Sequence, residues 1–269
     1  MKYINTPFNY TGSKFKLLEQ ILPKMDYTRS NFVDLFTGGG TVYTNILDKY
    51  DTVYINDIIE DLVSLHRIMK ENPTELTEKT MSLATCKEDK EKFLALRTSY
   101  NENKTPEKLW ALMLSCTSNL MRFNKKFLFN QTWGKRGWNP NTTKKTNEYV
   151  EHLSKFGDII KYSSVSFPDI PMIKDSMVYI DPPYINTEAG YNSYWSKELE
   201  MNLYEYVKQI DNQGNSFMIS GVLNHDGKES ETLFKLSNQF KMIELDYNYN
   251  KVSKNKNDKK TQEVIIVNY

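Results

Sequence analysis

The stretch MVYIDPPYIN, residues 177–186, ends an apolar run with an aspartate, two prolines and a tyrosine. Pro182 and Pro183 each fix φ and lack an amide donor, so the carbonyls around them belong to a stiff loop. Asp181 adds carboxylate oxygens, and Tyr184 adds an aromatic face on which a base can stack, worth about 1–3 kcal/mol. Acceptors beside a stacking surface suit a planar base with an exocyclic amine. The alternative, a proline turn that closes a strand, explains only the prolines.

A glycine-rich turn lies far upstream, in FVDLFTGGGTV at residues 32–42. Glycines after a strand permit positive φ and let a ligand approach the backbone. The spacing is neither G-x-G-x-x-G nor a P-loop. Asp57 ends the next expected strand, where an acidic side chain can accept hydrogen bonds from ribose hydroxyls; the alternative is a helix N-cap. Together with the glycines upstream, Asp57 favours a nucleoside-containing ligand. Because no phosphate-binding motif is present, a ligand without phosphates, such as S-adenosylmethionine, is favoured.

These motifs must be positioned by strands that alternate with helices. Short runs of β-branched and aromatic residues predict strands at 31–36, 52–57, 163–167, 177–181, 215–220 and 263–269. Helical patterns are found at 14–22, 58–70, 197–210 and 228–238. This alternation predicts an α/β fold with a mostly parallel sheet, and the nearly continuous apolar runs indicate burial on both faces of that sheet.

The middle of the chain has a different pattern. Residues 59–120 carry helical patterns without a convincing strand, and residues 122–140 interleave aromatic, basic and turn-forming residues, as in a hairpin or an extended loop. We therefore expect an insertion at 59–159. Between Glu107 and Glu148 there is no acidic residue, whereas eight basic residues occur there: Lys108, Arg122, Lys125, Lys126, Lys135, Arg136, Lys144 and Lys145.

Such local charge asymmetry indicates an anionic polymer as partner, and a solvated face is the alternative. A solvated face is the favoured interpretation of a second basic cluster, in which Asp258 is the only acidic residue: Lys251, Lys254, Lys256, Lys259 and Lys260. The net charge of +1 decides nothing by itself. Five aromatic residues lie in the first basic stretch and favour a nucleic acid over a protein: Phe123, Phe127, Phe129, Trp133 and Trp138.

Metal and membrane chemistry are not expected. The two cysteines, Cys86 and Cys116, and the three histidines are not at metal-ligand spacing, and we expect buried, reduced thiols. No run of 18 apolar residues is present, and the N-terminal MKYINTPFNYTGSK has no apolar signal region. These observations predict a cytoplasmic protein.

The DPPY tetrapeptide resembles the catalytic motif of S-adenosylmethionine-dependent amino methyltransferases. Along the chain, YTGSK, the glycine turn, a variable insertion and DPPY follow one another in this order. The order resembles that of the alpha group of DNA adenine methyltransferases, and within this group the phage Dam enzymes. The resemblance runs from about Asn9 to the end of the chain. Further counterparts are YINDI, SNLMRFN, WGKR, YNSYW, NHDGKES and EVIIVNY. DPPY alone is specific to amine methylation, and the ordered set is much more specific.

The resemblance implies a Rossmann-like methyltransferase fold. A catalytic domain would comprise 1–58 and 160–269, and a mainly helical target-recognition domain with a β-hairpin would comprise 59–159. The implied reaction transfers a methyl group from S-adenosylmethionine to the N6 amine of an adenine flipped out of duplex DNA. The catalytic residues would be Asp181, Pro182, Pro183 and Tyr184, with the amine held by the Asp181 side chain and the Pro182 carbonyl, and the ring stacked on Tyr184.

The resemblance also assigns binding residues. The cofactor would contact Tyr10, Gly12, Lys14, Phe36, Gly38, Gly40, Asp57 and Asp181. The double-stranded DNA would contact Asn119, Leu120, Met121, Arg122, Lys135 and Arg136. The enzyme would be a monomer or weak dimer on DNA, in a bacterial or phage-infected cell, without a metal. GATC is the suggested recognition sequence, although residues 118–120, 126–129 and 130–132 depart from the pattern of relatives that read it.

Two other functions remain open. DPPY-like loops also serve RNA adenine and protein amide methyltransferases. A non-catalytic DNA-binding relative is a different class, but Asp57 and Asp181 argue against it, because a binding protein would need neither.

Overall fold

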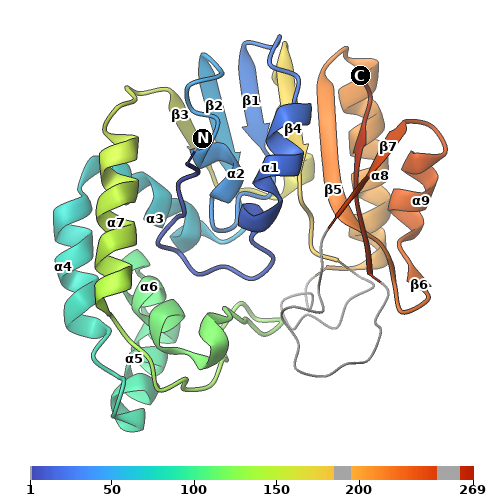
Figure 1. Cartoon of the computed structure of the whole chain (residues 1–269). Helices are drawn as coiled ribbons and strands as arrows, with labels where there is room; N and C mark the ends of the chain where they lie inside the picture. The colour runs from blue at the N-terminus through green and yellow to red at the C-terminus, as the bar shows by residue number, and fades with distance from the viewer. Residues whose placement is uncertain (1, 185–194, 247–260) are drawn as a thin grey trace.

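The computed structural model describes residues 2–184, 195–246 and 261–269. Its centre is a mixed sheet (Figure 1). The parallel part has the order β3-β2-β1-β4-β5. In that order the strands are Ile160–Ser163, Thr52–Asn56, Asn31–Asp34, Ser176–Ile180 and Ser216–His225. β8 (Thr261–Val267) lies antiparallel between β5 and β7 (Lys241–Leu245), and the short β6 (Lys228–Glu229) pairs with β5. The predicted mostly parallel α/β sheet is confirmed.

Both faces of the sheet are buried, as the apolar runs predicted. All five residues of β4 are buried, and the side chains of the last four alternate between two hydrophobic clusters. Met177 and Tyr179 belong to one cluster, while Val178 and Ile180 belong to the other. The first cluster is shared with α1 (Leu18–Ile21), α2 (Thr41–Thr44) and α3 (Glu60–Glu71), and the second with α8 (Lys197–Asn212) and α9 (Glu231–Ser237).

A helical group follows α3 and lies at one end of the sheet, to the lower left in Figure 1. It consists of α4 (Pro73–Leu83), α5 (Lys90–Glu102), α6 (Pro106–Ser115) and α7 (Pro140–Leu153). α4, α6 and α7 each begin at proline, which lacks the amide that a first turn leaves unpaired. Residues 109–115 of α6 are all buried, and α6 packs against α3, α4 and α5. Their apolar side chains join the cluster that covers one face of the sheet.

Residues 116–138, which we call the basic segment, connect α6 to the start of α7. Antiparallel bridges pair Cys116 with Trp133 and Phe123 with Phe129, so the segment doubles back as a hairpin. Phe123 and Phe129 are buried and pack against Tyr100 of α5. The hairpin reaches under the sheet in the view of Figure 1.

Some predicted elements were wrong. The strand expected at 163–167 lies at Ile160–Ser163 instead, because Ser163 and Ser164 turn the chain by bonding to Asn56 and Asp57. In place of one helix over 14–22, three short helical pieces follow one another, Lys14–Leu17, Leu18–Ile21 and Leu22–Lys24. The helix expected from 228 begins at Glu231, since Lys228–Glu229 pairs with β5. In the described ranges, no helix is both long and apolar enough to span a membrane.

Candidate active site

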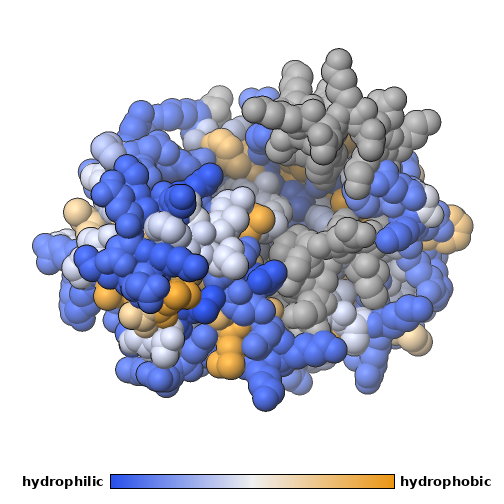
Figure 2. Space-filling view, turned by 90° about the horizontal axis from the view of Figure 1, so that it is seen from below, coloured by the Kyte–Doolittle hydropathy of each residue, from blue (hydrophilic) through white to orange (hydrophobic). Residues whose placement is uncertain are grey.

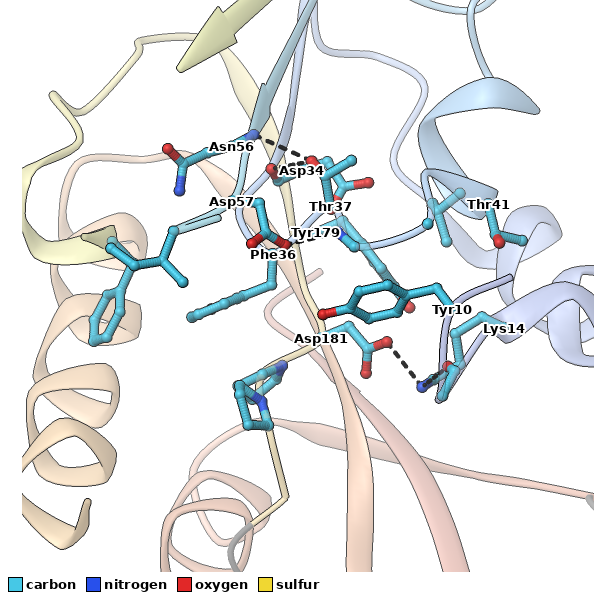
Figure 3. A pocket seen from close by; sticks show the side chains of 18 of the residues that line it. Tyr10, Lys14, Asp34, Phe36, Thr37, Thr41, Asn56, Asp57, Tyr179 and Asp181 are labelled. Atoms are coloured by element: carbon cyan, nitrogen blue, oxygen red, sulfur yellow. Dashed lines mark hydrogen bonds and ion pairs between the residues drawn. The ribbon is translucent and has the colours of Figure 1, made fainter. Parts of the chain in front are cut away.

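One pocket opens at the carboxyl ends of β1, β2 and β4 (Figure 3). Ligands of open α/β sheets bind at this edge, where connections from adjacent strands diverge. The pocket brings together nearly all predicted cofactor and catalytic residues: Tyr10, Gly12, Lys14, Phe36, Gly38, Asp57, Asp181, Pro182, Pro183 and Tyr184. They come from four segments that are far apart in the sequence.

The glycine loop (residues 36–42) is held between two aromatic groups. Gly38 has φ +51°, and a Cβ on it would lie 2.8 Å from Cε1 of Tyr10, whose ring packs on the loop. Gly40 has φ +74° and lies behind the pocket, where a Cβ would be 2.5 Å from Cε1 of His66. Gly40 is not among the residues that line the pocket, and its contact with the cofactor stays a prediction.

Asp57 is buried and binds the glycine loop. Its carboxylate accepts hydrogen bonds from the backbone N–H of Gly38 at 3.0 Å and of Ile59 at 3.0 Å. Asp57 is not the N-cap of α3, which is Ile59, although its carboxylate holds the turn that leads into this helix. Asp57 also lines the pocket, and its contact with a ribose stays a prediction. Burial raises the pKa of Asp57 to about 6, while the two backbone hydrogen bonds oppose this rise.

Asp181 accepts hydrogen bonds on both carboxylate oxygens. Oδ2 accepts from Nζ of Lys14 at 2.8 Å, and Oδ1 accepts from the Tyr184 hydroxyl at 2.7 Å and from Oγ of Ser220 at 3.0 Å. Ser220 also contacts the hydroxyl of Tyr179 at 2.8 Å. The carboxylate is therefore oriented from the DPPY motif, β5 and the N-terminal segment at once.

Lys14 joins the N-terminal motif to DPPY. Only 5% of its side chain is exposed, and its ammonium also donates to the Tyr184 hydroxyl at 2.7 Å and to the Gly12 carbonyl at 3.2 Å. A second carboxylate, that of Glu263 on β8, lies 3.9 Å away. Burial, and then the charge of Asp181, raises the pKa of Tyr184 well above its usual value, so its hydroxyl stays a donor.

Asp34 and Asn56 are among the pocket residues that the sequence did not indicate. Asp34 ends β1, and its Oδ1 is buried without a hydrogen-bond partner among the described residues. Burial, and then the charges of Asp181 and Asp57, raises the pKa of Asp34 well above its usual value. Asn56 donates to the carbonyls of Leu35 and Val165 and thereby ties strand ends together. Asp34 could have been found from the sequence, because it is an acidic residue at the end of the first strand, just as Asp57 is at the end of the second.

The predicted DNA-binding residues lie in the basic segment, outside the residues that line the pocket. Leu120 is 40% exposed, and Lys135 and Arg136 are exposed, whereas Met121 is buried. Asn119 has φ +54°, a left-handed conformation. Arg122 is half-buried and spans the hairpin, since its Nε and Nη2 donate to Asn130 Oδ1 and O at 3.0 Å each.

Both cysteines are buried, and burial raises the pKa of the Cys116 thiol to about 12. Across residues 2–184, 195–246 and 261–269, no group of three or more histidine, cysteine or acidic side chains is placed to hold a metal ion. The second basic cluster, at 251–260, lies outside the described residues.

Comparison with known proteins connects this pocket to a family. Residues 10–251 match the D12 class N6 adenine-specific DNA methyltransferases. The chain is 30% identical to modification methylase StsI of Streptococcus sanguinis, over 100% of the chain and 43% of that protein. It is 28% identical to type II methyltransferase M1.LlaDCHI of Lactococcus lactis, over 98% and 95%, and 25% identical to the DNA adenine methylase of Haemophilus influenzae, over 91% and 87%.

The chain thus spans about two fifths of the length of StsI and of M.FokI from Planomicrobium okeanokoites, at 43% of each. The resemblance to DNA adenine methyltransferases is confirmed, while the likeness to phage Dam enzymes in particular stays a prediction. Because the match covers most of the sequence, the chain belongs to the D12 class N6 adenine-specific DNA methyltransferase family.

Proposed function

We propose that the chain transfers a methyl group from S-adenosylmethionine to the N6 amine of adenine in duplex DNA. The observation that carries this proposal is the Asp181 carboxylate, which lies in one pocket with the glycine loop and Asp57. An acceptor for an amine therefore adjoins a nucleoside-type site, as a methyl transfer between the two requires.

The pocket residues fit S-adenosylmethionine. Asp57 would accept hydrogen bonds from the ribose hydroxyls, and Asp34, with a buried and unpartnered oxygen among the described residues, would accept from the ammonium of the methionine part. Phe36, Val165 and Phe167 give the pocket apolar walls for an adenine ring. The cofactor supplies an electrophilic methyl group on a sulfonium.

Asp181 would hold the target amine. The amine donates to a carboxylate oxygen and to the Pro182 carbonyl, which leaves the nitrogen lone pair directed at the methyl group. Oδ1 of Asp181 already accepts from the Tyr184 hydroxyl, so the incoming amine replaces that hydroxyl and the Tyr184 ring becomes the stacking surface. Lys14 and Ser220 keep the carboxylate in place. The carboxylate then stabilises the positive charge that develops on the nitrogen.

The helical group and the basic segment would recognise DNA. Residues 108–147 carry eight basic and no acidic side chains. The molecule seen from below, where the hairpin reaches under the sheet, shows a mostly hydrophilic surface (Figure 2). The target adenine must leave the duplex, because its amine is otherwise out of reach of the pocket. Arg136 is exposed and suits a bidentate guanine contact, whereas Arg122 is already engaged with Asn130.

GATC is the recognition sequence that we propose, with the chain acting as a monomer or weak dimer. An RNA adenine or a protein amide is the alternative substrate class, and a non-catalytic DNA-binding role is the alternative without chemistry. The names of the relatives, modification methylases and DNA adenine methylases, support DNA as the substrate.

The test is expression of the chain in a methylation-deficient host, followed by single-molecule sequencing of the host DNA. We expect N6-methyladenine at one short sequence, and none with folded Asp181→Ala protein, whose DNA binding should be largely intact. Unmodified DNA from cells that hold folded wild-type protein would reject the proposal. Methylated RNA or protein in the same cells would favour the alternative substrates.

A further inference from the structure

A buried row of hydrogen bonds lies behind the glycine loop, and we call it the His66 network. It consists of Tyr149 on α7, Tyr43 on α2, His66 on α3 and the Gly38 carbonyl. The two hydroxyls are 2.6 Å apart, the Tyr43 hydroxyl is 3.0 Å from Nδ1 of His66, and Nε2 of His66 is 2.9 Å from the Gly38 oxygen. All three side chains are at most 1% exposed.

The chemistry of the groups gives this row a direction. A carbonyl only accepts, so Nε2 of His66 must carry the proton, and Nδ1 of a neutral imidazole must then accept. Burial lowers the pKa of His66 to about 4, which keeps the ring neutral near pH 7. Tyr43 is nearer to Nδ1 than Tyr149 is, at 3.0 Å against 3.3 Å. The donors therefore run from Tyr149 to Tyr43, to His66, to Gly38.

The glycine loop and the His66 network are packed so closely that neither can move without the other. A Cβ on Gly40 would lie 2.5 Å from His66 Cε1 and 2.6 Å from Tyr43 Cε1. The rings of Phe8 and His66 also pack perpendicular to each other, with centroids 4.9 Å apart. A shift of either aromatic side chain must consequently displace the loop that forms the pocket wall.

The other end of α7 is tied to the basic segment. α7 begins at Pro140, only four residues after Arg136, and its N-cap Asn139 accepts from the N–H of Thr142. The Trp138 indole donates to Thr143 at 2.8 Å and packs on Trp110 with ring centroids 5.2 Å apart. One helix thus contacts both the segment with the basic side chains and the network behind the pocket.

We propose that Tyr149, Tyr43 and His66 are positioning residues that couple α7 to the glycine loop, so that DNA on the basic segment and S-adenosyl ligand in the pocket strengthen each other's binding. The inference rests on the proposed function. Because such coupling is reciprocal, each ligand raises the affinity for the other by the same factor, typically about 5-fold or more. The network acts through the Gly38 carbonyl and touches neither ligand.

The test is calorimetric titration of the full chain with S-adenosylhomocysteine, with and without a DNA duplex that carries the sequence methylated in the host. We expect the duplex to tighten binding to the wild type. Tyr149→Phe keeps the ring but removes the first donor, so the ratio of the two dissociation constants should fall toward one. Tyr100→Phe is the matched control, because Tyr100 as a residue is also fully buried but its hydroxyl bonds to Asp61 on α3, away from the loop.

Two further variants separate the network from general packing. His66→Gln retains a donor at the position of Nε2 and should keep the affinity for S-adenosylhomocysteine alone while losing the effect of DNA. His66→Leu should lose both. A DNA effect in Tyr149→Phe equal to that in the wild type, or none in the wild type, would overturn the inference while cofactor binding still stands. Failure of the wild type to bind S-adenosylhomocysteine would instead overturn the proposed function, and this inference with it.

Discussion

The ammonium of Lys14 lies 2.8 Å from the carboxylate of Asp181, although 167 positions separate the two residues in the sequence. Transferring an ammonium out of water costs several kcal/mol unless a counter-charge accompanies it. Lys14 is 5% exposed and Asp181 is 20% exposed, so each compensates the charge of the other. The YTGSK and DPPY motifs therefore meet in one ion pair, which links the N-terminal segment to the carboxyl end of β4.

Lys14→Met should destabilise the chain by about 3–5 kcal/mol, because it leaves a largely buried carboxylate without its counter-charge. Urea unfolding measures the loss. Adding Asp181→Asn to Lys14→Met should recover part of it, since the carboxylate nearest to the lost ammonium is then neutral, although that of Glu263 remains charged beside it. Lys79→Met is the control: it breaks an exposed pair with Glu75 and should have a far smaller effect. Equal losses for the two lysines would contradict a structural role for the buried pair.

Asp57 should make cofactor affinity depend on pH. Its pKa in the free chain is about 6, and hydroxyl donors favour the ionised carboxylate. Binding of S-adenosylhomocysteine should therefore weaken as the pH falls below about 6 and be constant above it. Asp57→Asn should bind roughly tenfold or more weakly, as expected for a lost hydrogen bond to a charged group.

The pH profile distinguishes contact from scaffolding. Asp57→Asn titrated between pH 5 and 8 should lose the inflection near 6 that Asp57 contributes, because an asparagine side chain does not titrate. A wild-type profile without an inflection, or an unchanged affinity in Asp57→Asn, would reject the ribose assignment and leave Asp57 as a residue that only holds Gly38 and Ile59.

The sequence predicted the meeting of the glycine loop, Asp57 and DPPY because all three follow strands, and the carboxyl ends of parallel strands share one edge. β7 was not predicted, since Leu245 is its only buried residue and an exposed edge strand has a weak apolar pattern. The contact of Lys14 with Asp181 and the contact of His66 with Gly38 could not be predicted either. Those contacts depend on how α3 and the N-terminal segment dock, and no local pattern encodes that docking.

Arg136→Ala should relax discrimination at one base pair of the recognition sequence by roughly 1–3 kcal/mol, because arginine contacts guanine through two hydrogen bonds. Competition between cognate duplexes and duplexes with single substitutions measures this loss. Lys135→Ala is the neighbouring control, and we expect it to weaken binding equally for all sequences, as a phosphate contact does. If Arg136→Ala behaved in the same way, Arg136 would be a phosphate contact as well.

Gly40→Ala should destabilise the chain more than Gly214→Ala, although both glycines have φ +74°. The left-handed conformation alone costs an alanine about 1–2 kcal/mol, and Gly214→Ala should show only that cost, since nothing lies within 4 Å of its Cβ position. At Gly40 the added methyl group would also press on His66 and Tyr43, at 2.5 Å and 2.6 Å. Urea unfolding of both variants gives the difference, and S-adenosylhomocysteine affinity should fall in Gly40→Ala alone. Equal unfolding free energies would mean that His66 and Tyr43 rearrange around the added methyl group without cost. The His66 network could then not transmit a displacement to the glycine loop.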